Sequence, residues 1–251
     1  MATKPASGTP LDTGSPLYSG LIAVYGLLEG TGTTITDSKG GNNGTTHDGS
    51  WSTDAYGPVW LTTQNNVGQP IAVTSFQVGS LTGNSWSFAF RAQTTTNVGN
   101  GVVAGDSTGQ GPFVALLSNG SYLFVRSSHA GDAAFSDFTD FSSAADYVVT
   151  YDGSGNMRAY KNGSASSSNP QSVDGFQPAT VSINAINNGY TTSVQNLELP
   201  GYVSYLYVWD GRVISPTEAA SLAANPFQIF QSGGGGGTFS QCMSVNVMGL
   251  G

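Results

Sequence analysis

The sequence predicts an all-β fold, either a sandwich or a barrel of short strands, with one short helix near the C-terminus. Two observations predict the sheets. Short apolar or alternating segments recur along the chain with turn residues between them, which is typical of a β-sandwich or a β-barrel rather than of βαβ units. The segment 85–91, SWSFAFR, carries an aromatic residue at every second position, as expected for a strand with one buried face.

The strands follow from their apolar patterns. Residues 21–28 form a mostly apolar run, which is typical of a strand buried on both faces. In the segment 85–91, Trp86, Phe88 and Phe90 share one face, and we expect this face to lie between the sheets. Further strands are expected at 113–117, 122–125, 147–151, 157–161, 181–186 and 202–209.

Turn residues join several of these strands. Asn-Gly pairs favour tight hairpin turns because both positions tolerate a positive φ. The pair 119–120 therefore predicts a hairpin, and the pair 162–163 predicts a second one after the strand 157–161. Residues 152–156, DGSGN, predict a wider turn before that strand.

One helix is expected after the last strand. Ser215 is a good N-cap, Pro216 suits the first helical position, and Glu218 completes a capping box. The following alanines and leucine favour a helix, and Asn225-Pro226 ends it.

These elements divide the chain into three parts. Residues 1–17, with three prolines among Gly, Ser and Thr, are expected to form an extended N-terminal arm. Residues 18–230 hold the sandwich and its helix. Residues 231–251 begin with a run of glycines that predicts a flexible linker, followed by a C-terminal tail.

The composition indicates which classes of binding partner to expect. Charged residues make up 9 % of the 251 residues and the net charge is −8, so the surface consists largely of uncharged polar side chains. Seven basic residues spread along the chain offer no stripe for phosphates, and we expect no nucleic-acid partner. No apolar run approaches the length of a membrane span. Cys242 is the only cysteine and the N-terminus has no signal-peptide pattern, so we expect synthesis in a reducing cytoplasm.

Four segments in this order resemble the laminin-G-like jelly-roll domains of the concanavalin A-like lectin and glucanase superfamily. They are EGTGT with DSKG and NG within 29–44, SWSF at 85–88, YVVTYDG with RAYKNG within 147–163, and YLYVWDGRVIS at 205–215. The resemblance covers about residues 18–230 and implies a two-sheet antiparallel jelly-roll sandwich. This fold carries lectins, adhesion modules, glycosidases and structural proteins, so it does not decide the function.

The sequence gives little sign of catalysis. Glycosidases need two carboxylates close together, and the glucanases of this superfamily carry acidic residues at alternating strand positions. Here Glu29, Glu198 and Glu218 each stand alone. His47 and His129, the two histidines, lack the spacing of a metal or triad motif. We therefore expect that the chain is not an enzyme.

Three aromatic residues are candidates for ligand binding. Trp51, Tyr56 and Trp60 lie close in sequence and could form a platform on which a sugar ring stacks. The alternative is that they cover a sheet edge or enter the core.

No cofactor is expected, with calcium as the one candidate ion. The resemblance implies that aspartates and backbone carbonyls could hold Ca²⁺, whose preferred ligands are oxygen atoms. The candidates are Asp37, Asp106 and Asp210. The alternative for Asp37 and Asp106 is that their carboxylates accept hydrogen bonds within turns.

The sequence thus favours a non-catalytic structural or binding module. We expect a bacteriophage virion surface protein, such as a capsid decoration, made in the host cytoplasm and anchored through its two termini to capsid proteins, other virion proteins or sister subunits. The alternative is a carbohydrate-binding adhesin or lectin module on a tail or a bacterial surface, with glycans as its partners.

Overall fold

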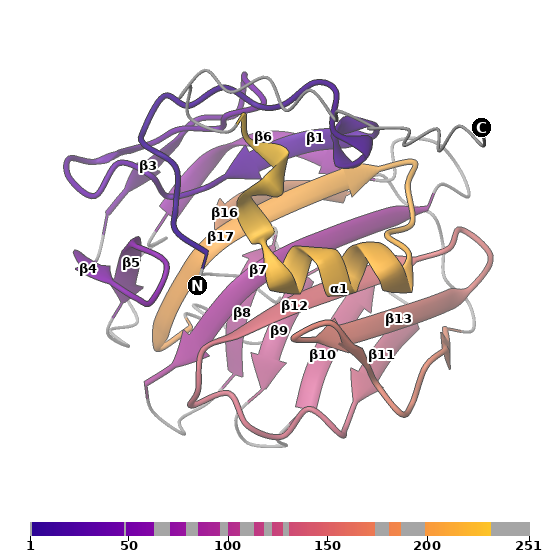
Figure 1. The fold of residues 1–251 in the computed structure, drawn as a ribbon. Coiled ribbons are helices and arrows are strands. Elements are labelled where there is room, and N and C mark those ends of the chain that lie inside the picture. Colours follow the sequence, from indigo (N-terminus) through magenta and orange to yellow (C-terminus); the bar gives the residue numbers. More distant parts are fainter. Residues whose placement is uncertain are drawn as a thin grey trace, which may run out of the picture.

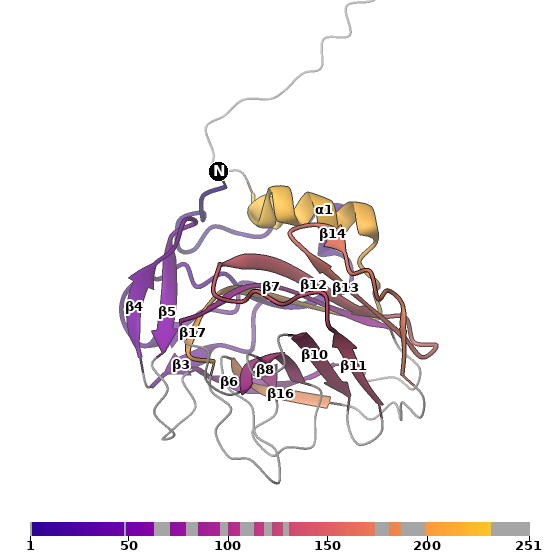
Figure 2. The ribbon, with the colours of Figure 1, turned by 90° about the horizontal axis from the view of Figure 1, so that it is seen from below.

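The computed structural model describes residues 2–47, 49–62, 71–78, 85–95, 100–105, 113–117, 122–127, 131–173, 181–186 and 199–231. Within these ranges the chain forms two antiparallel sheets that lie face to face (Figure 1). Helix α1 (Pro216–Ala224) covers the outer face of one sheet, so that helix, first sheet and second sheet form three layers (Figure 2). The predicted all-β sandwich with a short C-terminal helix is confirmed.

The first sheet lies between the helix and the second sheet. Every strand pair in it is antiparallel, and β1 and β15 pair with β17 and β13 beside the main order of strands. Its main order is β14 (Ser164–Ala165), β13 (Asn156–Lys161), β12 (Ala145–Tyr151), β7 (Trp86–Thr94), β17 (Gly201–Asp210), β5 (Pro58–Thr62) and β4 (Ser50–Thr53), with β1 (Leu21–Tyr25) and β15 (Gln171–Ser172) at its sides.

The second sheet is also antiparallel throughout its described strands. Its order is β11 (Gly131–Phe135), β10 (Tyr122–Ser127), β9 (Phe113–Leu117), β8 (Asn100–Gly105), β16 (Val181–Ile186), β6 (Ile71–Val78), β3 (Gly44–Thr46) and β2 (Thr34–Ile35). Neighbours that are far apart in sequence, such as β8 and β16, show that the fold depends on long-range pairing.

The inner core fills the space between the two sheets. Trp86, Phe88 and Phe90 alternate along β7 and are all buried there, as their spacing predicts. Tyr147, on the neighbouring strand β12, stacks on Phe90 with 5.2 Å between the ring centroids. The period of two in a strand therefore decides which face of the first sheet meets the second sheet.

A second, outer core lies on the opposite face of the first sheet. Tyr205, Tyr207 and Trp209 alternate along β17 and pack there beneath α1 and the 3₁₀ helix η2 (Pro226–Ile229). The indole N–H of Trp209 donates to the carbonyl oxygen of Leu17 at 2.7 Å. Both faces of this sheet are thus buried, which explains why β17 is apolar or aromatic along most of its length.

The helix begins as its sequence predicts. The Ser215 side chain accepts from the N–H of Glu218, and the Glu218 carboxylate accepts from the N–H of Ser215. Ala219 and Leu222 bury one side of α1 against the sheet. None of the helices in the described ranges is long and apolar enough to cross a membrane.

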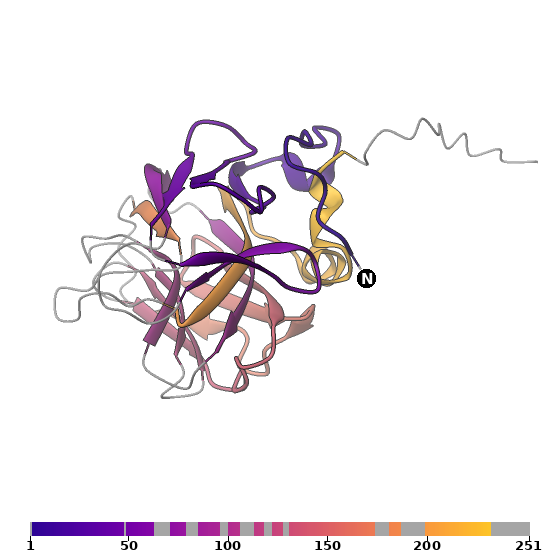
Figure 3. The ribbon, with the colours of Figure 1, turned by 90° about the vertical axis from the view of Figure 1, so that its left-hand side faces the viewer.

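The N-terminal segment packs on its own domain. The sequence predicts an arm that reaches a partner chain, but Leu11 and Leu17 are buried in the outer core because their apolar side chains find a surface there. The N–H of Gln231 donates to Pro10 and that of Asp12 donates to Ile229. Figure 3 shows this segment beside α1 and η2, with the short 3₁₀ helix η1 (Pro16–Tyr18) between the segment and β1. The predicted tail beyond residue 231 lies outside the described residues.

Candidate functional site

The candidate site starts from three polar residues on the outer face of the first sheet. Arg91 on β7 lies opposite Asp146 on β12 and opposite Tyr205 on β17. The three side chains therefore form a row across adjacent strands, on the face that carries α1. All three residues are buried.

Asp146 is the centre of this row. Its Oδ2 accepts from Arg91 Nη1 at 2.9 Å and from the Tyr56 hydroxyl at 3.0 Å. Its Oδ1 accepts from the Tyr205 hydroxyl at 2.9 Å. Three donors thus hold one carboxylate in a fixed position, which is how a buried charge is stabilised.

A turn between β4 and β5 completes the network. Asp54 Oδ2 accepts from Arg91 Nε at 3.0 Å, while Asp54 Oδ1 accepts from the backbone N–H groups of Tyr56 and Gly57 at 2.8 and 3.1 Å. The Arg91 guanidinium lies over the Tyr56 ring, 4.3 Å from its centroid. Two aspartates and one aromatic ring therefore surround a single guanidinium.

Burial and neighbouring charges shift the pKa values of Asp146, Tyr56 and Arg91. Burial raises the pKa of Asp146, and the Arg91 charge and the hydrogen bonds from Tyr205 and Tyr56 oppose this effect only in part. Burial and the neighbouring Asp146 raise the pKa of Tyr56 to about 12. Burial lowers the pKa of Arg91, but Asp146, Tyr56 and Asp54 outweigh it, so the pKa is raised. Tyr56 stays a neutral hydroxyl and Arg91 a cation at neutral pH.

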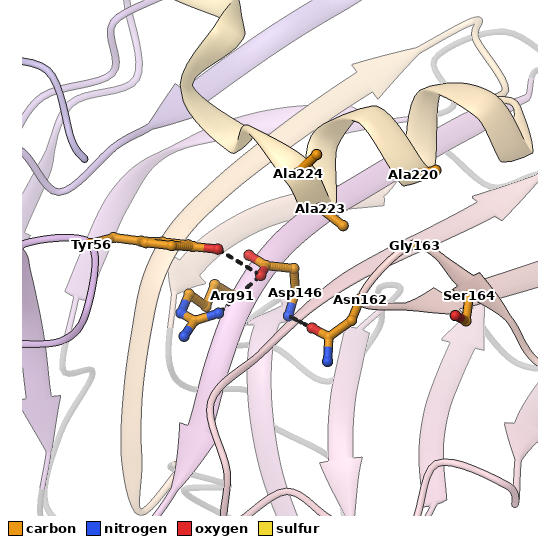
Figure 4. A pocket seen from close by; sticks show the side chains of 9 residues that line it. All are labelled: Tyr56, Arg91, Asp146, Asn162, Gly163, Ser164, Ala220, Ala223 and Ala224. Atoms are coloured by element: carbon orange, nitrogen blue, oxygen red, sulfur yellow. Dashed lines mark hydrogen bonds and ion pairs between the residues drawn. The ribbon is translucent and has the colours of Figure 1, made fainter. Parts of the chain in front are cut away.

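A pocket of about 630 Å³ lies above this network, within the size range of small-molecule sites. Figure 4 shows Arg91, Asp146 and Tyr56 on one side, and helix α1 opposite. We call it the helix-side pocket, and its lining residues are Tyr56, Arg91, Asp146, Asn162, Gly163, Ser164, Ala220, Ala223 and Ala224.

The hairpin turn between β13 and β14 forms a further wall. Asn162 and Gly163 have φ values of 50° and 79°, as expected for an Asn-Gly turn. A Cβ at Gly163 would lie 2.9 Å from Ala220 Cα, so only glycine lets the turn approach α1 this closely. The predicted hairpin is confirmed here, whereas the turn at 119–120 lies outside the described residues.

The pocket offers free hydrogen-bonding groups. Asn162 Oδ1 accepts from the N–H of Asp146 at 2.9 Å, which leaves the two N–H groups of Nδ2 without a partner among the described residues. The Ser164 hydroxyl and Arg91 Nη2 are likewise unbonded within the described ranges. The alanine methyl groups of α1 give the facing wall an apolar surface. The arrangement suits a small polar ligand that also has an apolar face.

The predicted aromatic platform is only partly assembled. Trp51 and Trp60 meet edge to face with centroids 5.4 Å apart, but Trp60 is 6 % exposed and belongs to the inner core. Trp51 is half-buried and its indole N–H donates to Gly32. Tyr56 lies on the other side of the sheet, in the outer core. Tyr56 and Trp60 therefore cannot bind one sugar ring together.

The two calcium candidates among the described residues, Asp37 and Asp210, have separate hydrogen-bond partners. Asp37 is buried, and its carboxylate accepts from the N–H groups of Val24 and Lys39 and from the Asn42 amide. Asp210 ends β17, where its N–H donates to Gly20, and Asp106 lies outside the described residues. In the described ranges no group of three or more His, Cys, Asp or Glu side chains could hold a metal ion.

Sequence reasoning missed the carboxylates of the site. Asp54 and Asp146 are separated by a long stretch of chain, and only the strand order β12-β7-β17 brings them to Arg91. One signal existed, because Arg91 and Asp146 are the single charged residues of the segments 86–94 and 145–151.

No family model matches the chain, and no curated protein sequence matches it. Solved structures do resemble it. The sialidase of Trypanosoma rangeli has a TM-score of 0.58 at 11 % identity, over 91 % of this chain and 37 % of the sialidase chain. The binding domain of botulinum neurotoxin DC, solved with rat synaptotagmin II, has a TM-score of 0.56 at 14 % identity, over 82 % of this chain and 51 % of the other.

The fold shared with these structures is an antiparallel β-sandwich. A botulinum neurotoxin type C structure, whose description links cell entry to two ganglioside molecules, has a TM-score of 0.53 at 15 % identity, over 82 % of this chain and 51 % of the other. The chain thus spans between about a third and a half of these neighbours. At such identities the likeness shows the fold alone.

The sialidase neighbours correct one expectation. The isolated glutamates predict that the chain is not an enzyme, but structures of this fold include sialidases, at 10–11 % identity and over part of their length. The glutamate pattern tests only one kind of glycosidase, so it was too narrow a basis for excluding catalysis.

Proposed function

We propose that the chain is a carbohydrate-binding module and that its ligand occupies the helix-side pocket. The observation that carries this proposal is the combination of unbonded donors with an apolar wall above a rigid network. Asn162 Nδ2, Ser164 Oγ and Arg91 Nη2 can bond hydroxyl groups, and the alanines of α1 can contact the C–H face of a sugar ring. The Arg91–Asp146 pair holds the floor in place, so little ordering is needed on binding.

The structural neighbours support a binding function in general terms. One sialidase structure is a complex with sialic acid, and one toxin structure is described as depending on gangliosides for cell entry. None of the neighbours named above is a virion protein, so the virion assignment gains no support from them. A carbohydrate-binding module is the better supported of the two functions predicted from the sequence.

The test is a glycan array followed by calorimetric titration of the glycans that bind. Ala224→Leu adds a larger side chain inside the pocket without touching the ionic network. We expect this variant to lose at least about tenfold in affinity, which corresponds to 1.4 kcal/mol. Ser221→Leu adds the same side chain on an exposed part of α1 that does not line the pocket, and it should bind as the parent does.

A third variant separates this pocket from the aromatic candidate. Trp51→Ala removes the half-buried indole on β4. If Trp51→Ala abolishes binding and Ala224→Leu does not, the ligand binds at the sheet edge and the pocket assignment is wrong. If no glycan binds the parent chain, the proposed function itself fails.

Hydrolysis of a bound glycoside is a second candidate, favoured by one observation. Asp146 places a carboxyl group in the lining of the same pocket, and glycoside hydrolysis uses carboxyl groups positioned beside the bound sugar. Mass spectrometry of array-positive glycans after incubation with the chain tests it. New reducing ends that disappear in Asp146→Asn support catalysis, and intact glycans contradict it.

A further inference from the structure

We infer that the helix-side pocket selects uncharged saccharides over acidic ones, and that Asp54 determines this selectivity from beneath the pocket. The inference rests on the proposed function and names its ligand class. It starts from the state of the single guanidinium in the pocket wall. An acidic sugar carries a carboxylate, and proteins bind carboxylates best with an arginine whose paired N–H groups are free.

Arg91 does not have that freedom. Its Nε is bound to Asp54 and its Nη1 to Asp146, at 3.0 and 2.9 Å. One positive charge is therefore shared between two carboxylates, and a third carboxylate would approach two negative charges at short range. Like charges brought together at a binding site oppose association.

Neither aspartate can move aside to release the guanidinium. The side chain of Asp54 is 2 % exposed, and its second oxygen is held by the N–H groups of Tyr56 and Gly57. Asp146 is held by the hydroxyl groups of Tyr56 and Tyr205. Swinging either side chain away would leave buried donors without acceptors, which is costly.

No other cation lines the pocket within the described residues. Lys4 is buried, and its ammonium group donates to the carbonyl oxygens of Leu27, Pro58 and Ser204. Lys161 Nζ donates to the carbonyl oxygen of Asp140 and lies beside the ring of Phe141. Arg212 pairs with Glu218 at the start of α1. The charge around the pocket therefore comes from Arg91 and its two aspartates.

An uncharged sugar meets no such obstacle. Its hydroxyl groups both donate and accept, so they can bond the Nδ2 group of Asn162, the hydroxyl of Ser164 and the remaining N–H groups of Arg91. The ionic network stays intact in this complex. The Arg91 network that repels a carboxylate thus accepts a neutral sugar.

The experiment compares matched glycan pairs, in which the same neutral oligosaccharide is presented with and without a terminal sialic or uronic acid. We expect the parent chain to bind the neutral member at least about tenfold more tightly. In Asp54→Asn the amide oxygen can still accept from the turn, whereas the amide NH2 group cannot accept from Arg91 Nε. One negative charge is removed and Arg91 Nε is released, so this preference should fall by about tenfold.

Asp152→Asn is the matched control. It removes the same charge from a residue that follows β12, roughly 20 Å along the strand from Asp146. The control should keep the preference of the parent. If the preference for neutral glycans fell equally in both variants, the net charge of the chain, rather than Asp54, would set the selectivity.

The outcomes separate this inference from the proposed function. If the parent binds acidic members as tightly as neutral ones, the selectivity is wrong while the carbohydrate site stands. If a folded Asp54→Asn keeps the full preference, Asp54 has no such role. If the parent binds no glycan, both fail together.

If Asp54→Asn does not fold, the inference can be tested on the parent chain by measuring its glycan affinity at different salt concentrations. Raising the ionic strength from about 0.05 to about 0.5 M screens charge–charge interactions. The parent's weak affinity for acidic members should then rise or stay constant, because salt relieves a repulsion. A fall in this affinity with salt would reveal an attraction, and would overturn the inference.

Discussion

Arg91 Nη1 lies 2.9 Å from Asp146 Oδ2 on the neighbouring strand, and Arg91 Nε lies 3.0 Å from Asp54 Oδ2 in the turn before β5. One guanidinium thus joins the outer face of the first sheet to the turn that carries Tyr56. The same side chain therefore fixes two parts of the helix-side pocket relative to each other.

Removing the central carboxylate should destabilise the fold. Asp146→Ala leaves Arg91 with one partner and deprives Tyr56 and Tyr205 of their acceptor. Truncating one member of a buried ion pair costs about 3–5 kcal/mol. Urea unfolding followed by tryptophan fluorescence measures this loss. Asp140→Ala, on the exposed loop before β12, is the control: it removes two exposed hydrogen bonds from Ser142 and should cost much less stability than Asp146→Ala.

Position 163, in the hairpin turn beside α1, should accept no residue other than glycine without a loss of stability. Gly163→Ala places a Cβ 2.9 Å from the helix backbone at a φ of +79°. Gly32 has a φ of +77° with nothing within 4 Å of the same position, so Gly32→Ala measures the backbone strain without the contact. We expect a loss of about 1–2 kcal/mol for Gly32→Ala. A similar loss for Gly163→Ala would contradict the close approach of turn and helix.

The two tryptophans at the sheet edge should differ in their effect on stability. Trp60 is 6 % exposed in the inner core, so Trp60→Ala should cost about 3–5 kcal/mol. Trp51 is half-buried, and Trp51→Ala should cost about 1 kcal/mol. Thermal unfolding of both variants gives the comparison. Equal losses would show that Trp51 is as much a core residue as Trp60.

Lys4 should make stability depend on pH. Burial lowers its pKa from 10.5 to about 7, although Asp54 and Glu29 oppose this effect and Arg91 adds to it. Between pH 7 and 10.5 the unfolded chain therefore binds more protons than the folded chain, so stability rises with pH, by at most about 1.4 kcal/mol per unit. Lys4→Met should lose this part of the slope between about pH 7 and 9. If the free energy of unfolding depended on pH equally in parent and variant, Lys4 would not be a buried amine that titrates in this range.

Much of the sandwich could be predicted because its signals are local. The alternation of Trp86, Phe88 and Phe90 placed β7 and its inner face, and the capping box at Ser215 placed the start of α1. The Asn162-Gly163 pair specified its own turn. Each of these features depends on neighbouring residues and on backbone geometry.

The candidate site could not be predicted in this way. Arg91, Asp146 and Asp54 meet because β12, β7 and β17 are neighbours and because the β4–β5 turn folds over them. That order is a property of the whole sheet. The three aromatic candidates are divided between two faces for a related reason: Tyr56 lies in a turn facing the outer core, whereas Trp60 points into the inner core.

The packing of the N-terminal segment was not predicted, because composition alone does not show what a segment covers. Prolines and small residues predicted an extended backbone at residues 1–17, but Leu11, Leu17 and the buried ammonium of Lys4 fix this segment to its own domain. Two leucines among polar residues were the available signal. Apolar side chains in such a segment indicate that it packs on an apolar surface, and here both leucines pack in the outer core.

The most direct measurement is a crystal structure of the chain soaked with a neutral oligosaccharide identified on the array. We predict a sugar ring between α1 and the Asn162–Ser164 turn, with hydrogen bonds to Asn162 Nδ2 and Ser164 Oγ and with the Arg91–Asp54 and Arg91–Asp146 pairs intact. A sugar bound at Trp51, or one whose hydroxyl groups have displaced an aspartate from Arg91, would contradict it.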